Sequence, residues 1–154
     1  MRIKTALILF TIILFTSTIS HGIEPDIGAQ SAILMDSISG RVLYSINSQE
    51  RLPMASTTKI MTALVAIENG DMEDVVNIKR DWIGVEGSSI YLYDNEKITK
   101  KDLLYGLMLR SGNDAAIALA NYIGGDISTF VEMMNMRSKE IGALNTNFIN
   151  PHGL

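Results

Sequence analysis

The sequence contains no cysteine among its 154 residues. Disulfide bridges and thiolate metal sites are therefore excluded, and cysteine usage carries no information on the redox compartment. Only two histidines are present, His21 and His152, and they lie too far apart in sequence to suggest a pair of ligands. This argues against a zinc site. No feature of the sequence predicts a bound metal ion or another cofactor.

Basic residues are also few, with 13 Lys and Arg against 17 Asp and Glu and a formal net charge of −4. Removal of an N-terminal segment that carries Arg2 and Lys4 would leave 11 basic against 17 acidic residues, or −6. This acidic balance argues against a nucleic-acid partner. Because 47% of the residues are hydrophobic and only 19% are charged, we expect a packed core rather than global disorder. The length fits one domain or part of a larger protein.

Residues 1–22 have the pattern of a secretory signal peptide. Arg2 and Lys4 form a short positive region, and residues 6–15 are almost wholly apolar. This apolar run is shorter than the span of about 20 residues that crosses a membrane comfortably. An uncleaved N-terminal anchor is the alternative, and membrane association stays open. In either case we expect the remainder to be exported to the cell envelope or periplasm.

Two short strands and a helix are expected in the first half of the remaining chain. Residues 31–35 and 41–46 have strand character, and the turn between them closes near Gly40. Apolar residues then recur at helical spacing from Ser56 to about Ile67, and Gly70 is a plausible end of that helix.

The second half predicts mainly helices. Residues 71–97 mix charges and glycines and predict an irregular connection with a short strand-like run at 75–78. A helix is expected from Thr99, its N-cap, with Leu103, Leu104, Leu107 and Met108 on one apolar face. Two further helices are expected over the ranges 114–123 and 128–141.

The segment around Lys59 carries the first candidate for chemistry. Lys59 is the only charged residue between Met54 and Ile67, and Ser56 precedes it by one helical turn on the same face. Apolar surroundings lower the pKa of a lysine, so a neutral amine becomes accessible near neutral pH. Beside a serine hydroxyl, such an amine is a general base next to a nucleophile. Taken alone, the four-residue pattern is common and favours the alternative, a buried helix whose lysine reaches water.

A second candidate lies at Ser111-Gly112-Asn113, between two predicted helices. Gly112 permits an abrupt turn, which could expose a hydroxyl and a carboxamide in a cleft. There Ser111 could relay a proton, and Asn113 could bind a substrate amide or hold a lysine amine. A helix cap is the alternative reading. The combination of this motif with Ser56-x-x-Lys59 is typical of one class of serine acyl enzymes.

Three stretches together resemble the D-alanyl-D-alanine carboxypeptidases, the low-molecular-mass penicillin-binding proteins of the serine peptidase S11 family. They are Ser56 to Lys59, Leu104 to Ala116, and Asn150-Pro151-His152-Gly153-Leu154. The order and spacing match, and the likeness runs from about Ile27 to Leu154. It implies an α/β (α+β) fold of the β-lactamase/transpeptidase type, in which a sheet is flanked by helices and an all-helical region.

The resemblance also implies a function. Residues 23–154 would be an S11 catalytic domain, with 23–70 starting its α/β part and 71–154 forming its mainly helical part. Its substrate would be a peptidoglycan stem peptide ending in D-Ala-D-Ala, and β-lactams would be inhibitors. Ser56 would be the acyl-ester nucleophile and Lys59 the proton acceptor. Ser111 and Asn113 would complete the catalytic set.

One part of the family pattern is absent from the sequence. The family carries a Lys-Thr-Gly motif on a later strand, which binds the substrate carboxylate, and this chain contains no such motif. We therefore expect an incomplete catalytic domain, from a fragment, a frameshift or a short product. A non-catalytic remnant and a β-lactamase are the alternatives to a carboxypeptidase.

Overall fold

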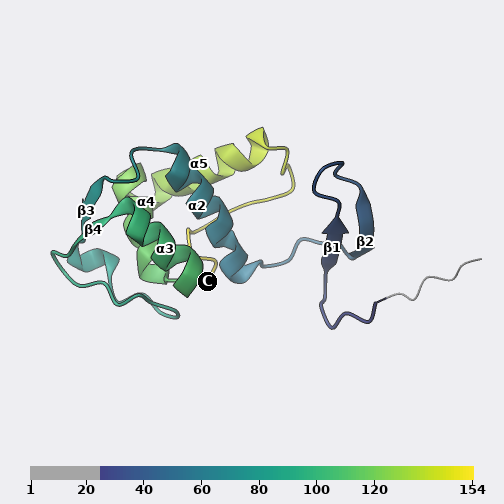
Figure 1. Cartoon of the computed structure of the whole chain (residues 1–154), viewed down its shortest axis with the longest axis horizontal. Coiled ribbons are helices and arrows are strands. Elements are labelled where there is room, and N and C mark those ends of the chain that lie inside the picture. Colours follow the sequence, from purple (N-terminus) through teal and green to yellow (C-terminus); the bar gives the residue numbers. More distant parts are fainter. Residues whose placement is uncertain (1–24) are drawn as a thin grey trace, which may run out of the picture. The chain divides into compact units, whose positions relative to one another are not determined.

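The computed structural model describes residues 25–154, so the expected signal peptide at residues 1–22 lies outside the described residues. The chain divides into two compact units, one ending at Gln49 and the other spanning Glu50–Leu154 (Figure 1). The division expected from the sequence, 23–70 and 71–154, stays a prediction.

The described part of the first unit contains a β-hairpin. Strand β1 (Ala32–Met35) pairs antiparallel with β2 (Val42–Ile46). Between them, the Asp36 carboxylate accepts a hydrogen bond from the Ser39 amide at 2.7 Å, and Gly40 has a φ of +69° that favours glycine. The two predicted strands and the turn near Gly40 are confirmed.

The second unit is mainly helical, and each helix expected from the sequence is confirmed with small shifts at its ends. Its helices are η1 (Ala55–Thr57), α2 (Thr58–Glu68), η2 (Arg80–Trp82), α3 (Lys100–Arg110), α4 (Asn113–Gly124) and α5 (Ile127–Glu140). Two three-residue strands, β3 (Val75–Asn77) and β4 (Lys97–Thr99), pair antiparallel and precede α3. The α+β class is therefore confirmed.

Local side chains explain where these helices begin and end. Thr99 caps α3 by accepting a hydrogen bond from the Asp102 amide at 3.0 Å, as the sequence predicts. Asp126 caps α5 by accepting from the Thr129 amide at 2.8 Å. Each cap satisfies one of the amides that have no partner in the first turn of a helix. Gly70 follows α2 with a φ of +83°, a conformation that costs glycine little.

The core of this unit lies around α2 and α4. Helix α2 packs against α3, α4 and α5, and residues 115–120 of α4 are all buried. Most of these residues are alanines, which allow neighbouring helices to approach closely. The buried apolar residues of α2 divide between two clusters, with Ala63 and Ala66 in one and Met61 and Val65 in the other. Helix α2 is thus held from several sides.

The apolar residues that recur at helical spacing in α2 do not all lie on its buried face; they are Ile60, Ala63, Leu64 and Ile67. Ile60 and Ile67 are 62% and 56% exposed, whereas Lys59 and Thr62 are 2% and 0% exposed. Helix α2 is hydrophobic nearly all round, so its pattern does not single out one face. The inward assignment of Met108 on α3 is also wrong, because this side chain is 50% exposed.

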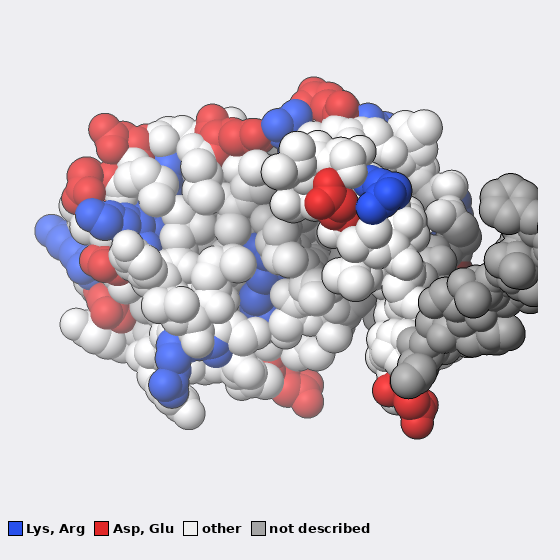
Figure 2. Space-filling model, turned by 45° about the vertical axis from the view of Figure 1, so that its right-hand side comes forward, with Lys and Arg blue, Asp and Glu red and all other residues white. Residues whose placement is uncertain are grey.

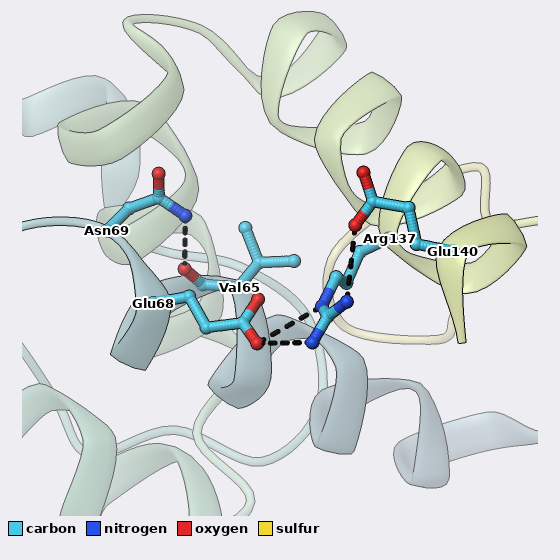
Figure 3. Close-up of polar contacts among 5 residues, drawn as sticks. All are labelled: Val65, Glu68, Asn69, Arg137 and Glu140. Atoms are coloured by element: carbon cyan, nitrogen blue, oxygen red, sulfur yellow. Dashed lines mark hydrogen bonds and ion pairs between the residues drawn. The ribbon is translucent and has the colours of Figure 1, made fainter.

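Polar contacts fix the C-terminal end of α2 (Figure 3). Arg137 of α5 donates to the Glu68 carboxylate through Nη2 at 2.7 Å and through Nε at 3.1 Å, and it also pairs with Glu140 at 3.2 Å. The Asn69 side chain donates to the Val65 carbonyl at 2.8 Å. Both nitrogens donate to the same oxygen, Glu68 Oε1, and two such donors restrain the geometry more than a single bond does. Helix α5 therefore holds α2 at the end opposite Ser56.

A buried lysine closes the same end of α2. Lys100 is fully buried, and its Nζ donates to the carbonyls of Asn69 and Gly70 at 2.8 and 2.6 Å. A cation at this position satisfies carbonyls left free at the helix end and complements the negative end of the helix dipole.

Acidic and basic side chains are interspersed over the described residues on the face shown in Figure 2, where no broad basic area is seen. Within residues 25–154, none of the helices combines the length and the apolar character needed to cross a membrane.

Candidate active site

The structure brings Ser56 and Lys59 together at the start of α2. Ser56 lies in the short helix η1, and Lys59 lies in the first turn of α2. Ser56 is exposed, and Lys59 Nζ lies 3.2 Å from its Oγ. The preceding residue, Ala55, has a φ of +47°, a conformation that is uncommon for a residue with a Cβ. Backbone strain of this type gathers at functional sites.

The Lys59 amine is enclosed by the protein. The residue is 2% exposed, and Nζ also donates to the His152 carbonyl at 3.1 Å. Burial lowers the pKa of Lys59 below its ordinary value, because desolvation disfavours the charged form. Burial and the Lys59 charge also lower the pKa of His152. The neutral form of the Lys59 amine is therefore populated at a lower pH than the neutral form of a lysine in water.

Ser111 lies on the other side of the Ser56 hydroxyl. Its Oγ is 3.1 Å from Ser56 Oγ, so the Ser56 oxygen has one polar neighbour from α2 and one from the end of α3. Ser111 itself adopts the left-handed conformation, with φ 55° and ψ 33°. The sequence-based expectation that Gly112 makes the abrupt turn is wrong, because Gly112 has a φ of −62°. A Cβ at Gly112 would lie 3.0 Å from Asp114 Oδ1, so close packing explains why this position suits glycine.

Asn113 is held from behind by a neighbouring loop. It is 2% exposed, its Nδ2 donates to the Glu86 carbonyl at 2.6 Å, and its amide donates to the Ser88 carbonyl at 2.7 Å. In the part of the chain that the structure describes, no hydrogen bond joins its side chain to Lys59. The expected role of Asn113 in holding the lysine or a substrate amide stays a prediction.

The next residue, Asp114, organises the same loop. Its carboxylate accepts four hydrogen bonds, from the Ser89 hydroxyl at 2.7 Å and from the amides of Ile90, Leu92 and Ala115 at 3.0, 3.1 and 3.0 Å. Burial raises the pKa of Asp114, but these hydrogen bonds together lower it more, so the net pKa lies below its ordinary value. An ionised carboxylate thus anchors residues 89–92 beside Ser111 and Asn113.

Sequence reasoning missed the contributions of Thr62, Asp114 and the His152 carbonyl. Thr62 follows Lys59 by three residues and is fully buried, and its Oγ1 donates to the Pro151 carbonyl at 2.6 Å. The spacing from Lys59 is the signal that could have identified Thr62, because residues three apart share a helix face. No local signal could have identified a carbonyl 93 residues away from Lys59.

The geometry supports nucleophilic chemistry at Ser56. A hydroxyl within hydrogen-bond reach of a desolvated amine is the arrangement of a nucleophile and its general base. Ser111 offers a second hydroxyl through which a proton could pass. Among residues 25–154, no group of three or more histidine, aspartate or glutamate side chains is placed to hold a metal ion.

Comparisons with known proteins agree on one family. The model of the peptidase S11 family, described as D-alanyl-D-alanine carboxypeptidase, matches residues 18–154. The D-alanyl-D-alanine carboxypeptidase DacF of Bacillus subtilis is 44% identical over 131 residues, which cover 82% of this chain and 34% of DacF. DacC of Escherichia coli is 38% identical over 141 residues, covering 84% of this chain and 35% of DacC. The chain thus spans about a third of the length of these curated relatives.

Solved structures show the same relationship. The D-alanyl-D-alanine carboxypeptidase DacD from Francisella tularensis superposes with a TM-score of 0.84 at 34% identity, over 94% of this chain and 36% of DacD. Penicillin binding protein 5 from Haemophilus influenzae gives a TM-score of 0.81 at 37% identity, over 87% of this chain and 41% of that protein. The transpeptidase-like fold that the sequence predicts is confirmed by these likenesses.

Proposed function

Because the chain belongs to the peptidase S11 family of D-alanyl-D-alanine carboxypeptidases, we propose that it carries the nucleophile and the base of a serine-type D-Ala-D-Ala carboxypeptidase. One observation carries the proposal: Ser56 Oγ lies 3.2 Å from Lys59 Nζ and 3.1 Å from Ser111 Oγ. Both distances are within the reach required for direct proton transfer.

The first half of the reaction forms an acyl-enzyme. Neutral Lys59 accepts the Ser56 proton, and the Ser56 oxygen attacks the carbonyl carbon of the bond between the two D-alanines. The C–N bond then breaks, the terminal D-alanine leaves, and Ser111 relays the proton from Lys59 to the leaving amine. The Ser56 backbone amide would stabilise the oxyanion of the tetrahedral intermediate.

The second half restores the enzyme. Water attacks the ester on Ser56, the shortened peptide is released as a carboxylate, and Ser56 regains its proton. We assign Asn113 to binding a substrate amide or orienting Lys59. Its burial and its 2.6 Å bond to the Glu86 carbonyl support a fixed rather than a mobile side chain. The same nucleophile would open a β-lactam ring and keep the acyl group.

The proposed substrate is a peptidoglycan stem peptide ending in D-Ala-D-Ala, and the proposed location is the cell envelope or periplasm. The family relationship and the apolar segment within residues 1–22 support export. Membrane association belongs to the same proposal and rests on that segment alone.

Labelling with a fluorescent penicillin tests the proposal. The chain should take up the label covalently, and Ser56→Ala should abolish the uptake while the far-ultraviolet circular dichroism spectrum stays unchanged. Mass spectrometry of the labelled peptide should place the adduct on Ser56. Release of D-alanine from a Lys-D-Ala-D-Ala peptide then tests turnover.

Each alternative predicts a different result. Absence of any label on the folded chain would favour a non-catalytic protein. Rapid hydrolysis of the penicillin with no lasting adduct would favour a β-lactamase. Undiminished labelling of Ser56→Ala would remove Ser56 from its role.

A further inference from the structure

Two successive carbonyl groups from residues 150–154 face the buried side of α2. The Pro151 carbonyl accepts from Thr62 Oγ1 at 2.6 Å, and the His152 carbonyl accepts from Lys59 Nζ at 3.1 Å. Lys59 and Thr62 lie three residues apart and are both almost fully buried. In Figure 1 the end of the chain lies close to the first turn of α2. The two side chains therefore hold adjacent peptide groups of the 150–154 segment.

The 150–154 segment is itself fixed by internal hydrogen bonds. Asn150 Oδ1 accepts from the amides of His152 and Gly153 at 3.1 and 2.6 Å, and Asn150 Nδ2 donates to the Leu154 carbonyl at 2.6 Å. Gly153 has a φ of +88°, and a Cβ there would lie 1.9 Å from the carbonyl oxygen of Ala55. This close approach requires glycine. The segment thus contacts the turn that precedes Ser56 as well as the lysine that follows it.

The His152 carbonyl has a chemical effect on the Lys59 amine. A neutral lysine amine has two N–H donors and one lone pair, and it can rotate among three staggered positions. An N–H donated to the His152 carbonyl restricts that rotation and leaves the lone pair free to face Ser56 Oγ, 3.2 Å away. The carbonyl also satisfies a donor that would otherwise be buried without a partner.

We infer that Thr62 is a positioning residue for the Ser56–Lys59 pair, because its hydroxyl fixes the Pro151 carbonyl and, through the next peptide group, the His152 carbonyl that orients the Lys59 amine. The inference deepens the proposed function, since it rests on Lys59 acting as the base. Thr62 does not touch the reacting atoms. Its effect passes entirely through the 150–154 segment.

Replacement of Thr62 by valine tests the inference, because the shape is kept and only the hydroxyl is lost. We expect Thr62→Val to slow penicillin acylation of Ser56 by about tenfold or more, since displacements near 1 Å can reduce rates about a hundredfold. The fold should persist by circular dichroism. Thr62→Ser retains the hydroxyl and should restore most of the rate.

Ser138→Ala is the matched control. Ser138 is as fully buried as Thr62, and its hydroxyl also donates to a backbone carbonyl, at Asn135 within α5, at 2.9 Å. The two substitutions therefore remove the same kind of bond and should lower stability similarly, but only Thr62→Val should slow acylation. Equal acylation rates in the two variants, after correction for the folded fraction, would overturn the inference.

A second readout does not depend on activity. Hydrogen exchange at the amides of His152 and Gly153 should accelerate in Thr62→Val and not in Ser138→Ala. The titration midpoint of Lys59, followed by NMR of its Cε, should move upward as water reaches the amine. If the unmodified chain takes up no penicillin, the proposed function fails, and these measurements then decide the inference. Unchanged exchange and an unchanged midpoint in Thr62→Val would overturn it.

Discussion

Replacement of Asp114 by asparagine should destabilise the protein strongly although it changes only one heavy atom. The carboxylate accepts four hydrogen bonds, two on each oxygen. An amide nitrogen accepts none, so whichever oxygen is replaced, at least one backbone amide loses its acceptor and faces an N–H group instead, and the remaining hydrogen bonds are no longer made to a charge. Hydrogen bonds to a charged group contribute roughly 1.5–3 kcal/mol each. The expected loss is therefore about 3–6 kcal/mol, a large part of the usual stability of a domain.

Asp126→Asn provides the control for this prediction. The Asp126 carboxylate accepts one hydrogen bond from the Thr129 amide and one from the Thr129 hydroxyl. These bonds lower the pKa of Asp126. Asparagine is as good an N-cap as aspartate, so this change should leave the free energy of unfolding nearly unchanged. Urea unfolding followed by circular dichroism measures both values. Faster hydrogen exchange at the Ile90 and Leu92 amides in Asp114→Asn would locate the effect in the anchored loop.

The pH dependence of the Asp114 effect has a defined sign. The pKa of Asp114 in the folded chain lies below its ordinary value, so its ionised form stabilises the fold at every pH above its pKa in the unfolded chain, about 4. This stabilisation is lost as pH falls through the lower folded pKa. The difference in the free energy of unfolding between the unmodified chain and Asp114→Asn should therefore have its full size at pH 7 and become smaller below about pH 4. A loss at pH 7 no larger than that of Asp126→Asn, or a difference in the free energy of unfolding that does not change with pH, would refute this reasoning.

Three further substitutions test the site and its support. Lys59→Arg keeps the charge but supplies no neutral amine, so penicillin acylation of Ser56 should fall by about 10²–10⁴-fold; a near-normal rate would point to another base. In the unmodified chain, because burial lowers the pKa of Lys59, the acylation rate should rise with pH and level off below the ordinary lysine value of 10.5. Asn113→Ala removes the bond to the Glu86 carbonyl and should reduce acylation less than Lys59→Arg does, which the same labelling assay compares directly. Lys100→Met removes the two hydrogen bonds donated to the Asn69 and Gly70 carbonyls at the end of α2 and should lower the free energy of unfolding in urea by about 2–4 kcal/mol, while the labelling rate per folded molecule stays unchanged.

The local part of the site could be predicted from the sequence. Ser56 and Lys59 lie three residues apart, and a helix brings such residues onto one face whatever the surrounding fold. The stop signals at Gly70 and the cap at Thr99 were also predictable, because they depend on the chemistry of one or two residues.

The rest of the site depends on packing that no local pattern contains. The apolar sequence of α2 offers several equivalent faces, and only contact with other helices decides that Thr62 is buried while Ile60 is exposed. The left-handed conformation belongs to Ser111 rather than to Gly112, which has a φ of −62°. Local propensity favours glycine in that conformation, so propensity alone selects the wrong one of these two residues.

The separation in sequence between Lys59 and its carbonyl acceptor has a consequence for the order of folding. Ser56 and Lys59 are neighbours in one turn of helix, which forms within about a microsecond. The His152 carbonyl lies 93 residues from Lys59, and the Pro151 carbonyl lies 89 residues from Thr62. Contacts this distant must wait for closure of a long loop, so they form late. We therefore expect α2 to be helical well before Lys59 is desolvated, and a partly folded chain to hold a hydrated, protonated lysine beside an unreactive serine. Chemical reactivity at Ser56 would then be among the last properties that the folding chain acquires.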